Sequence, residues 1–330
     1  MRRFFIFIII CFSINYGYAQ KIKVLATTSM IADMARNIAG DQLDVQCILP
    51  IGGDPHIYEP TPRDAQKAAD ADLILVNGLT LEGWMKELIM NSGTKAKVVV
   101  VTEGVVAITS AEHKGAADPH AWMTASNGLI YVENIFKSFV QIAPKEKDFF
   151  EKNYLKYSAE LTEVDTYIKN KILQIPDSQR ILITSHDAFH YYGTRYGLRL
   201  ESVMGTSTDA DVQTSDIIRL VKIIKKSGVS SIFIESTINP KLLKQLAKDN
   251  FVVIGGNLFA DSLGDEKSGA DTYLNMLRHN ADVISKALST PKSAANLKNT
   301  EGPNPFSLTF TFFGFVGLCG VCVYFLGKKG

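Results

Sequence analysis

Cysteine is scarce in this chain. Only four occur in 330 residues: one lies in an N-terminal apolar run, two lie in a C-terminal one, and Cys47 alone remains between them. No internal disulfide can therefore form in the part of the chain that folds. The pair Cys319 and Cys322 in "CGVC" lacks the further ligands of a metal site, so we interpret it as a packing feature.

An excess of charge of either sign is also absent. The chain has 35 Lys and Arg against 34 Asp and Glu, a formal net charge of +1. A nucleic-acid-binding protein needs a basic face, so we expect no nucleic-acid partner. With 46% hydrophobic and 21% charged residues, the composition is that of an ordinary globular protein and excludes wholesale disorder. A chain of this length supports one large or two medium domains.

The N-terminal residues 1–19 predict a secretory signal peptide. Two arginines precede an apolar run over residues 4–12, and cleavage is expected after the small residue Ala19. Lipid attachment at Cys11 is not favoured, because the bulky Ile10 precedes it where a small residue is needed.

The C-terminal residues 305–326 form an uncharged and mostly apolar run. As a helix, a run of about 22 residues spans about 33 Å, enough for a hydrocarbon core of about 30 Å. Lys328 and Lys329 follow it and should stay in the cytoplasm, and the polar residues 289–304 before it predict a flexible linker. We therefore expect a periplasmic or other extracytoplasmic protein that a transmembrane helix anchors to the cytoplasmic membrane. The alternative is a buried C-terminal helix.

Short β-rich runs alternate with amphipathic helical patterns along the rest of the chain. Several runs are almost continuously apolar, as parallel strands buried on both faces are, and the alternation predicts parallel α/β sheets. Thr61 and Pro62 mark the start of one helix, and "TSDIIRLVKIIKKSG" predicts another that starts at its Thr-Ser cap and ends at Gly228. The expected strands lie within residues 22–30, 43–49, 72–78, 97–103, 180–185, 198–204, 231–236 and 251–256.

A long helical pattern separates the two groups of four strands. Residues 143–176 contain no glycine, are bounded by two prolines and have apolar residues at helical spacing, which predicts one helix of roughly 30 residues. Two helices with a break near Ser158 are the alternative. The expected fold is α/β, with two parallel-sheet lobes at residues 20–142 and 177–288 joined by this long, rigid linking helix.

Three of the six histidines follow predicted strands. His56 follows the strand ending at Leu49, in "GGDPH"; His120 follows the strand near Glu103, in a second Asp-Pro-His; and His186 comes directly after "RILITS". In open α/β sheets, ligands bind beyond the carboxyl ends of the strands. If the lobes face each other, the three imidazoles line one interlobe cleft.

A carboxylate follows the last strand of the second lobe. Asp261 lies in the polar loop after "FVVIGG", and a mixture of imidazole and carboxylate suits zinc and the neighbouring divalent transition metals. Each histidine taken alone also fits a turn, a core position or a helix cap. We interpret His190 as a packing residue, and His113 and His279 as surface residues.

Six segments of the chain carry a family resemblance. They are "GGDPHIYEPTPRDAQKAADADLILVNGLTLEGWM", "DPHAWM", "TSHDAFHYYGTRYGL", "GTSTDADVQTSDIIRLVKIIKKSGVSSIFIES", "NPKLLKQLA" and "LFADSLGD". Over about residues 22–287 the chain resembles the solute-binding proteins of zinc/manganese ABC importers, which include ZnuA-like, TroA-like and PsaA-like proteins. The resemblance implies two α/β lobes joined by one long helix, and a metal site in the cleft between them. The metal ligands that it implies are His56, His120, His186 and Asp261.

The resemblance also implies a function. Such proteins bind a divalent metal ion as cargo, deliver it to a membrane permease and are not enzymes; we expect this one to be a monomer. Three imidazoles and one carboxylate favour Zn(II), with Mn(II) as the alternative, because manganese prefers more oxygen ligands. By family analogy, a glutamate in place of His186 would point toward manganese.

The chain departs from the family pattern in two places. The interval between the first two ligand motifs holds only "SAEHKGAA", so the long His/Asp-rich loop of many zinc-binding members is absent. The predicted C-terminal span is also unusual, because members are free in the periplasm or anchored through a lipid.

Two other functions stay open from the sequence. One is a secreted, membrane-tethered zinc metallohydrolase, in which Asp261 acts as the base; the other is a metal-binding adhesin. No HExxH motif is present, and the four ligands are about 64, 66 and 75 residues apart, which favours a closed site assembled from two lobes. Glu59, Asp187 and Glu235 are the candidates for orienting the imidazoles.

Overall fold

The computed structural model describes residues 21–109, 117–209 and 211–289. The predicted signal peptide, nearly all of the predicted linker, the apolar run at 305–326 and His113 lie outside these residues. Among the helices that the structure describes, none combines the length and the apolar character needed to cross a bilayer.

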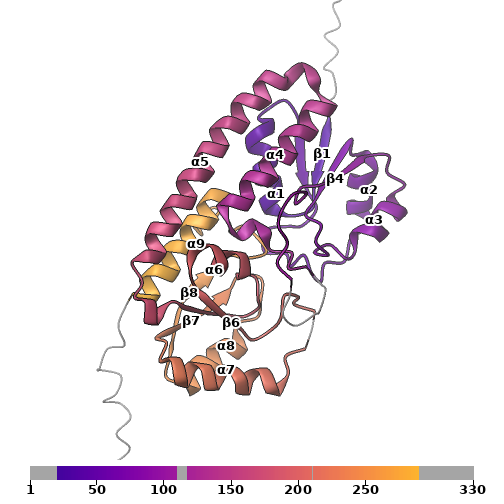
Figure 1. Ribbon diagram of the computed structural model, residues 1–330. Helices are drawn as coiled ribbons and strands as arrows, with labels where there is room; N and C mark the ends of the chain where they lie inside the picture. Colours follow the sequence, from indigo (N-terminus) through magenta and orange to yellow (C-terminus); the bar gives the residue numbers. More distant parts are fainter. Residues whose placement is uncertain (1–20, 110–116, 210, 290–330) are drawn as a thin grey trace, which may run out of the picture.

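The first lobe is built on one parallel sheet with the strand order β2-β1-β3-β4 (Figure 1). Successive side chains of a strand point to opposite faces. Leu73 and Leu75 of β3 therefore pack with α1 and α4, while Ile74 and Val76 pack with α2 and α3. The elements are β1 Lys23–Ala26, α1 Ser29–Ala39, β2 Asp44–Cys47, α2 Pro62–Asp70, β3 Leu73–Val76, α3 Met85–Ser92, β4 Lys97–Val100 and α4 Ala125–Ile142.

The start of α2 is fixed by the predicted cap. The Thr61 hydroxyl accepts a hydrogen bond from the Asp64 backbone, the Asp64 carboxylate accepts one from the Thr61 backbone, and Pro62 opens the helix. This reciprocal pair satisfies two N–H groups that a helix start leaves unpaired. The "GGDPH" loop is therefore held at its far end by a rigid helix.

The second lobe has the four predicted strands, which form two hydrogen-bonded parallel pairs, β5 with β6 and β7 with β8. Strand β5 lies beside β7, but at their carboxyl ends the Glu235 carboxylate accepts the N–H groups of Ser185 and His186. The Glu235 side chain, and not a backbone carbonyl, therefore accepts these two N–H groups just beyond the end of β5. The elements are β5 Ile181–Thr184, α6 His190–Tyr196, β6 Arg199–Ser202, α7 Thr214–Ser227, β7 Ser231–Glu235, α8 Lys241–Asp249, β8 Val253–Leu258 and α9 Tyr273–Leu288.

Helix α7 confirms one predicted end and corrects the other. Gly228 ends it with φ of 66°, as expected of a glycine after a helix. Gln213 occupies the cap position at its start, without a side-chain hydrogen bond, so Thr214 is the first helical residue and not the cap.

One unbroken helix, α5 (Lys147–Leu173), runs along both lobes (Figure 1). The alternative break near Ser158 does not occur. Its buried residues Tyr157, Leu161, Val164 and Ile168 recur at helical spacing and belong to a hydrophobic cluster that also contains α1, α4 and α9. The helix spans about 40 Å and contributes to the core of both lobes. Short 3₁₀ turns lie at Ala121–Met123, Pro144–Glu146 and Asp177–Gln179.

Candidate metal centre

The structure brings the four predicted site residues together. His56 lies in the loop between β2 and α2, His120 precedes the turn that leads into α4, His186 follows β5, and Asp261 follows β8. One ligand atom from each residue lies within 4.8 Å of the others. His120, His186 and Asp261 are almost completely buried, while His56 is half-buried and closes the cluster on its more open side.

The spacing of the ligand atoms fits one metal ion. The His120 Nε2 atom lies 3.2 Å from Nε2 of His56 and 3.3 Å from Nε2 of His186. The Asp261 carboxylate lies 3.4 Å from Nε2 of His120 and 3.2 Å from Nε2 of His186. Ligands about 2.0–2.1 Å from a tetrahedral ion are about 3.3–3.4 Å apart. The buried Oδ1 of Asp261 has no hydrogen-bond partner, so the cluster presents an acceptor that a cation would satisfy.

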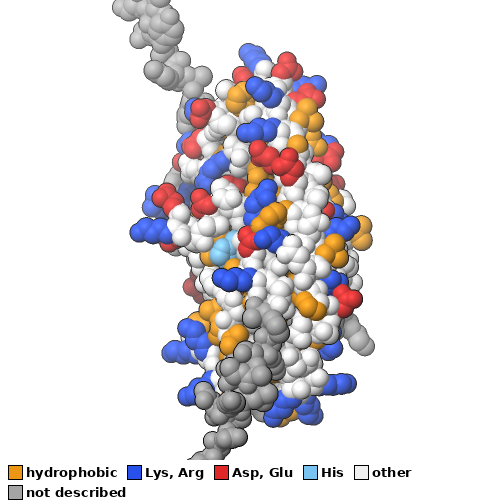
Figure 2. All heavy atoms as spheres, turned by 90° about the vertical axis from the view of Figure 1, so that its left-hand side faces the viewer, with side chains coloured by type: hydrophobic (Ala, Val, Ile, Leu, Met, Phe, Trp, Pro, Cys, Tyr) orange, Lys and Arg blue, Asp and Glu red, His pale blue; other side chains and the backbone are white. Residues whose placement is uncertain are grey.

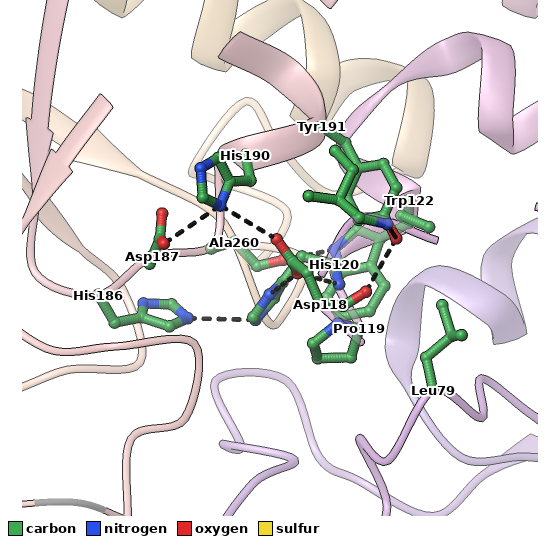
Figure 3. Close-up of polar contacts among 12 residues, drawn as sticks. Leu79, Asp118, Pro119, His120, Trp122, His186, Asp187, His190, Tyr191 and Ala260 are labelled. Carbon is green, nitrogen blue, oxygen red and sulfur yellow. Dashed lines mark hydrogen bonds and ion pairs between the residues drawn. The ribbon is translucent and has the colours of Figure 1, made fainter. Parts of the chain in front are cut away.

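Asp118 orients the imidazole of His120. Its Oδ1 atom lies 2.8 Å from Nδ1 of His120 and accepts the backbone N–H of the same residue at 2.9 Å (Figure 3). Both side chains are fully buried. An imidazole whose Nδ1 is held in this way presents Nε2 to the centre of the site.

Glu235 holds His186 in the same manner. Its Oε2 atom lies 2.7 Å from Nδ1 of His186, and its Oε1 atom accepts the backbone N–H of His186 at 2.9 Å. Of the three residues predicted to orient the imidazoles, Glu235 alone does so among the described contacts. Asp187 pairs with His190 at 3.2 Å, and Glu59 is exposed on the rim of a groove beside Trp84.

The sequence reasoning missed Asp118. The signal that could have found it is the Asp-Pro-His motif itself, because an aspartate two residues before a histidine can bind both its backbone and its ring. The first copy of the motif behaves differently. Asp54 accepts the His56 backbone N–H at 2.9 Å, but its other oxygen accepts the Thr208 hydroxyl of the second lobe at 2.7 Å. The same turn therefore orients a ring in one copy and links the lobes in the other.

A second interlobe contact fixes the loop of Asp261. The indole N–H of Trp122 donates to the carbonyl of Ala260 at 2.8 Å, and Tyr191 donates its hydroxyl to the carbonyl of Asp118. Both contacts connect "DPHAWM" of the first lobe to elements of the second. The two halves of the site are thus held in register by hydrogen bonds next to the ligands.

Burial and the neighbouring carboxylates set the proton affinity of the site. Burial lowers the pKa of His56 to about 4. Burial also opposes the charge of His120, but the Asp118 and Asp261 carboxylates outweigh it and raise the pKa to about 9. The same balance, with Glu235 and Asp261, raises the pKa of His186 well above its usual value. An incoming metal ion must therefore displace protons from two imidazoles.

The other described histidines lie outside the cluster. His190 was interpreted as a packing residue, but its Nδ1 atom lies between the carboxylates of Asp187 at 3.2 Å and Asp118 at 3.8 Å (Figure 3). His279 was expected on the surface, but it is half-buried, contacts the Asn257 carbonyl at 3.2 Å and packs against a phenylalanine ring.

Comparisons with known proteins agree with this architecture. The family model "ZnuA: Zinc-uptake complex component A periplasmic" matches residues 24–287. The "Manganese ABC transporter substrate-binding lipoprotein PsaA" of Streptococcus anginosus is 37% identical over 278 residues, which covers 82% of this chain and 90% of that protein. The solved "periplasmic zinc binding protein TroA" from Treponema pallidum aligns with a TM-score of 0.78 at 33% identity, over 82% of this chain and 100% of that one.

A metal-bound structure is also similar. The Mn-bound periplasmic metal binding protein of Candidatus Liberibacter asiaticus aligns with a TM-score of 0.75 at 31% identity, over 81% of this chain and all of that one. The family match covers most of the chain, and relatives at more than 30% identity are covered almost from end to end. This chain therefore belongs to the ZnuA family of periplasmic zinc-uptake complex components.

Proposed function

We propose that the protein captures one divalent transition-metal ion with His56, His120, His186 and Asp261 and delivers it to the membrane permease of an ABC importer. The observation that carries the proposal is the division of the four ligands between the lobes. His56 and His120 come from the first lobe, and His186 and Asp261 from the second. An ion held in this way ties the lobes together, and separating them leaves only two ligands on each side.

We propose zinc as the cargo. Three imidazole nitrogens and one carboxylate form the ligand set that zinc favours, whereas manganese prefers more oxygen. Manganese is the second candidate, because streptococcal relatives are named for manganese and the Liberibacter structure is Mn-bound. Elemental analysis of natively purified protein decides between them: zinc at about one equivalent supports the proposal, and manganese at that level replaces it.

The proposed activity includes no chemical step. Four protein ligands fill a tetrahedral ion, whereas a hydrolytic zinc site keeps one position for water. The competing metallohydrolase requires that position to be open. Turnover of peptide or ester substrates by the zinc-loaded protein, abolished by the His186→Ala substitution, would support the hydrolase instead.

A titration tests the ligand assignment. His56→Ala and His186→Ala should each weaken zinc binding by a large factor, because each removes one of four ligands. His279→Ala is the matched control, since this half-buried histidine lies outside the cluster. If the double variant of His56 and His186 bound zinc as the parent does, the assignment would be wrong.

We also propose that the mature protein is an extracytoplasmic monomer anchored by the apolar run at residues 305–326. The family is described as periplasmic, and streptococcal relatives are named lipoproteins, so a location at the membrane fits both. Its expected partners are the metal ion and the permease, with no nucleic acid. Cell fractionation of the full chain and of a version ending at Asn304 tests the anchor. An uncleaved full-length chain in the soluble periplasmic fraction would disprove it.

A further inference from the structure

One stretch of the second lobe carries an uneven charge. Helices α7 and α8 together contain seven lysines and arginines against two aspartates, Asp216 and Asp249, and Glu235 of β7 lies between the helices in the sequence. Glu235 is buried at the metal centre, where it contacts His186. The outer surface of this stretch is therefore basic, although the whole chain is almost neutral.

Six lysines of these two helices are exposed and face solvent. Both helices bury one stripe, with Leu220, Ile224 and Leu243, against the same hydrophobic cluster of the lobe. Their outer stripes therefore belong to one layer of the surface. None of the six lysines forms an ion pair with a carboxylate that the structure describes, whereas Arg219 pairs with Glu201 at 2.9 Å. The six are Lys222, Lys225, Lys226, Lys241, Lys244 and Lys248.

Exposed apolar side chains flank these lysines. Ile218 of α7 is 50% exposed, and Phe251, which follows α8, is 74% exposed. Phe251 also has φ of 53°, in the left-handed region that is unfavourable for a bulky residue. Lysines combined with exposed aromatic and aliphatic side chains are typical of surfaces that lie at a lipid–water interface.

The chain leaves the folded body at this end. Helices α7 and α8 lie at the lower end of the molecule in Figure 1, and Figure 2 shows Lys and Arg side chains around that end. The carbonyl of Ala287, near the end of α9, accepts from the hydroxyl of Ser231 at the start of β7, and β8 pairs there through Val253. The apolar run at 305–326 lies further along the chain, outside the described residues.

We propose that the α7–α8 surface, formed by the six lysines with Ile218 and Phe251, binds the headgroups of anionic phospholipids. Paired with an anionic bilayer, each lysine gains about fivefold in partitioning, and the apolar side chains enter the headgroup region. None of these side chains is a metal ligand, although Lys241 lines a pocket that also contains Ser185, next to His186. The proposal therefore does not depend on which metal the protein carries.

Vesicle co-sedimentation tests the proposal with residues 21–289. A solved relative aligns over its whole length with 82% of this chain, so we expect residues 21–289 to fold without the terminal segments, and a cooperative melting transition of the purified fragment checks this. The parent should bind vesicles of phosphatidylglycerol and phosphatidylcholine at about 50 mM salt, and lose binding near 0.5 M salt because the charges are screened. Pure phosphatidylcholine should bind weakly or not at all.

Three variants locate the contact. Replacing Lys241, Lys244 and Lys248 with glutamine should lower partitioning about 100-fold. Phe251→Asn should lower vesicle partitioning several-fold but keep its salt dependence. Asparagine is suitable here because it tolerates the left-handed backbone conformation of this position. The matched control removes three exposed lysines elsewhere, at positions 86, 95 and 152, and should retain binding within about twofold. Unchanged zinc affinity and melting temperature show that each variant is folded.

Three results would overturn the proposal. The parent fails to bind anionic vesicles at low salt, the control loses as much binding as the α8 variant, or neutral and anionic vesicles bind equally. The first of these, combined with salt-sensitive binding to an acidic protein partner, would assign the surface to protein docking instead.

Discussion

Replacing Asp118 with asparagine tests how the site prepares its ligands. The change keeps the size of the side chain and an oxygen near Nδ1 of His120, but it removes a fully buried charge 2.8 Å from that nitrogen. A carboxylate behind an imidazole makes Nε2 a stronger metal ligand, and losing such a partner lowers metal affinity by about 10–100-fold. That range corresponds to about 1.4–2.8 kcal/mol of binding free energy.

The same carboxylate also makes protons compete with the metal. It raises the pKa of His120 to about 9, so at pH 7.5 the metal-free parent holds a proton there, and removing it costs about 2 kcal/mol. Without Asp118, burial opposes the charge of the ring and only Asp261 favours it, so the pKa of His120 falls and the metal has less of that proton to displace. The two effects oppose each other near neutral pH, and only the loss of ligand strength remains at pH 9. We therefore expect the ratio of zinc Kd values, variant over parent, to grow more than tenfold between pH 7 and 9.

Competition with a chromophoric zinc chelator measures both Kd values across this range. Calorimetry in buffers of different ionisation enthalpy should also show about one fewer proton released by the variant at pH 7.5. Asp187→Asn is the control, because it removes a carboxylate next to the site that contacts His190 and no ligand. A ratio that does not change with pH, or an equal loss in the control, would refute the role assigned to Asp118.

Three further predictions concern the protonation of the site, the hydrogen bond between the lobes and the packing of α5. In the parent, the two imidazoles with carboxylate partners are protonated below their raised pKa values. Chelator competition should therefore show zinc affinity falling about 100-fold from pH 7.5 to 6.5, because zinc displaces both protons. Histidines with ordinary pKa values near 6.5 would give a much smaller change. Thr208→Val removes the hydrogen bond to Asp54 between the lobes. Stopped-flow chelation should then show zinc dissociating about tenfold faster. An unchanged rate would mean that this contact does not hold the site closed. Leu161 belongs to the fully buried stripe of α5, so Leu161→Ala should lower the free energy of unfolding, measured in urea, by about 2–5 kcal/mol. Leu155→Ala on the exposed face should change it by less than about 0.5 kcal/mol. Similar losses in both variants would contradict the packing described.

Apolar periodicity was sufficient to predict the elements. Each of the eight strands overlaps a short apolar run that predicted it, although β8 ends two residues beyond its run and β4 is largely exposed, so local apolar character rather than burial on both faces identified the strands. The long helix was predicted for a similar reason, since residues 143–176 contain no glycine and repeat their apolar residues at helical spacing. The hydrogen bond from the Ser185 backbone to the Glu235 carboxylate could not be predicted, because it joins residues 50 positions apart in the sequence.

The candidate site was predictable at the level of loops but not of hydrogen bonds. Strand ends place His56, His120 and His186 on one side of their sheets, whatever the detailed packing. Which carboxylate lies behind which ring depends on side-chain geometry across the cleft. Glu59 and Asp187 were as plausible in sequence as Glu235, yet one is exposed and the other pairs with His190. The Asp-Pro-His motif makes Asp118 a candidate partner of His120, but the motif alone does not decide the role, because its other copy places Asp54 against Thr208 instead of the His56 ring.

The continuous core along α5 has a consequence for how cargo is released. Because one hydrophobic cluster contains α5 together with α1, α4 and α9, a wide swing of the lobes would expose apolar surface over the length of the helix. Under the proposed function, opening the cleft therefore costs free energy, and we expect the isolated protein to release its ion slowly. The permease would then have to stabilise the open form, so the timing of release would depend on the partner while capture depends on this chain.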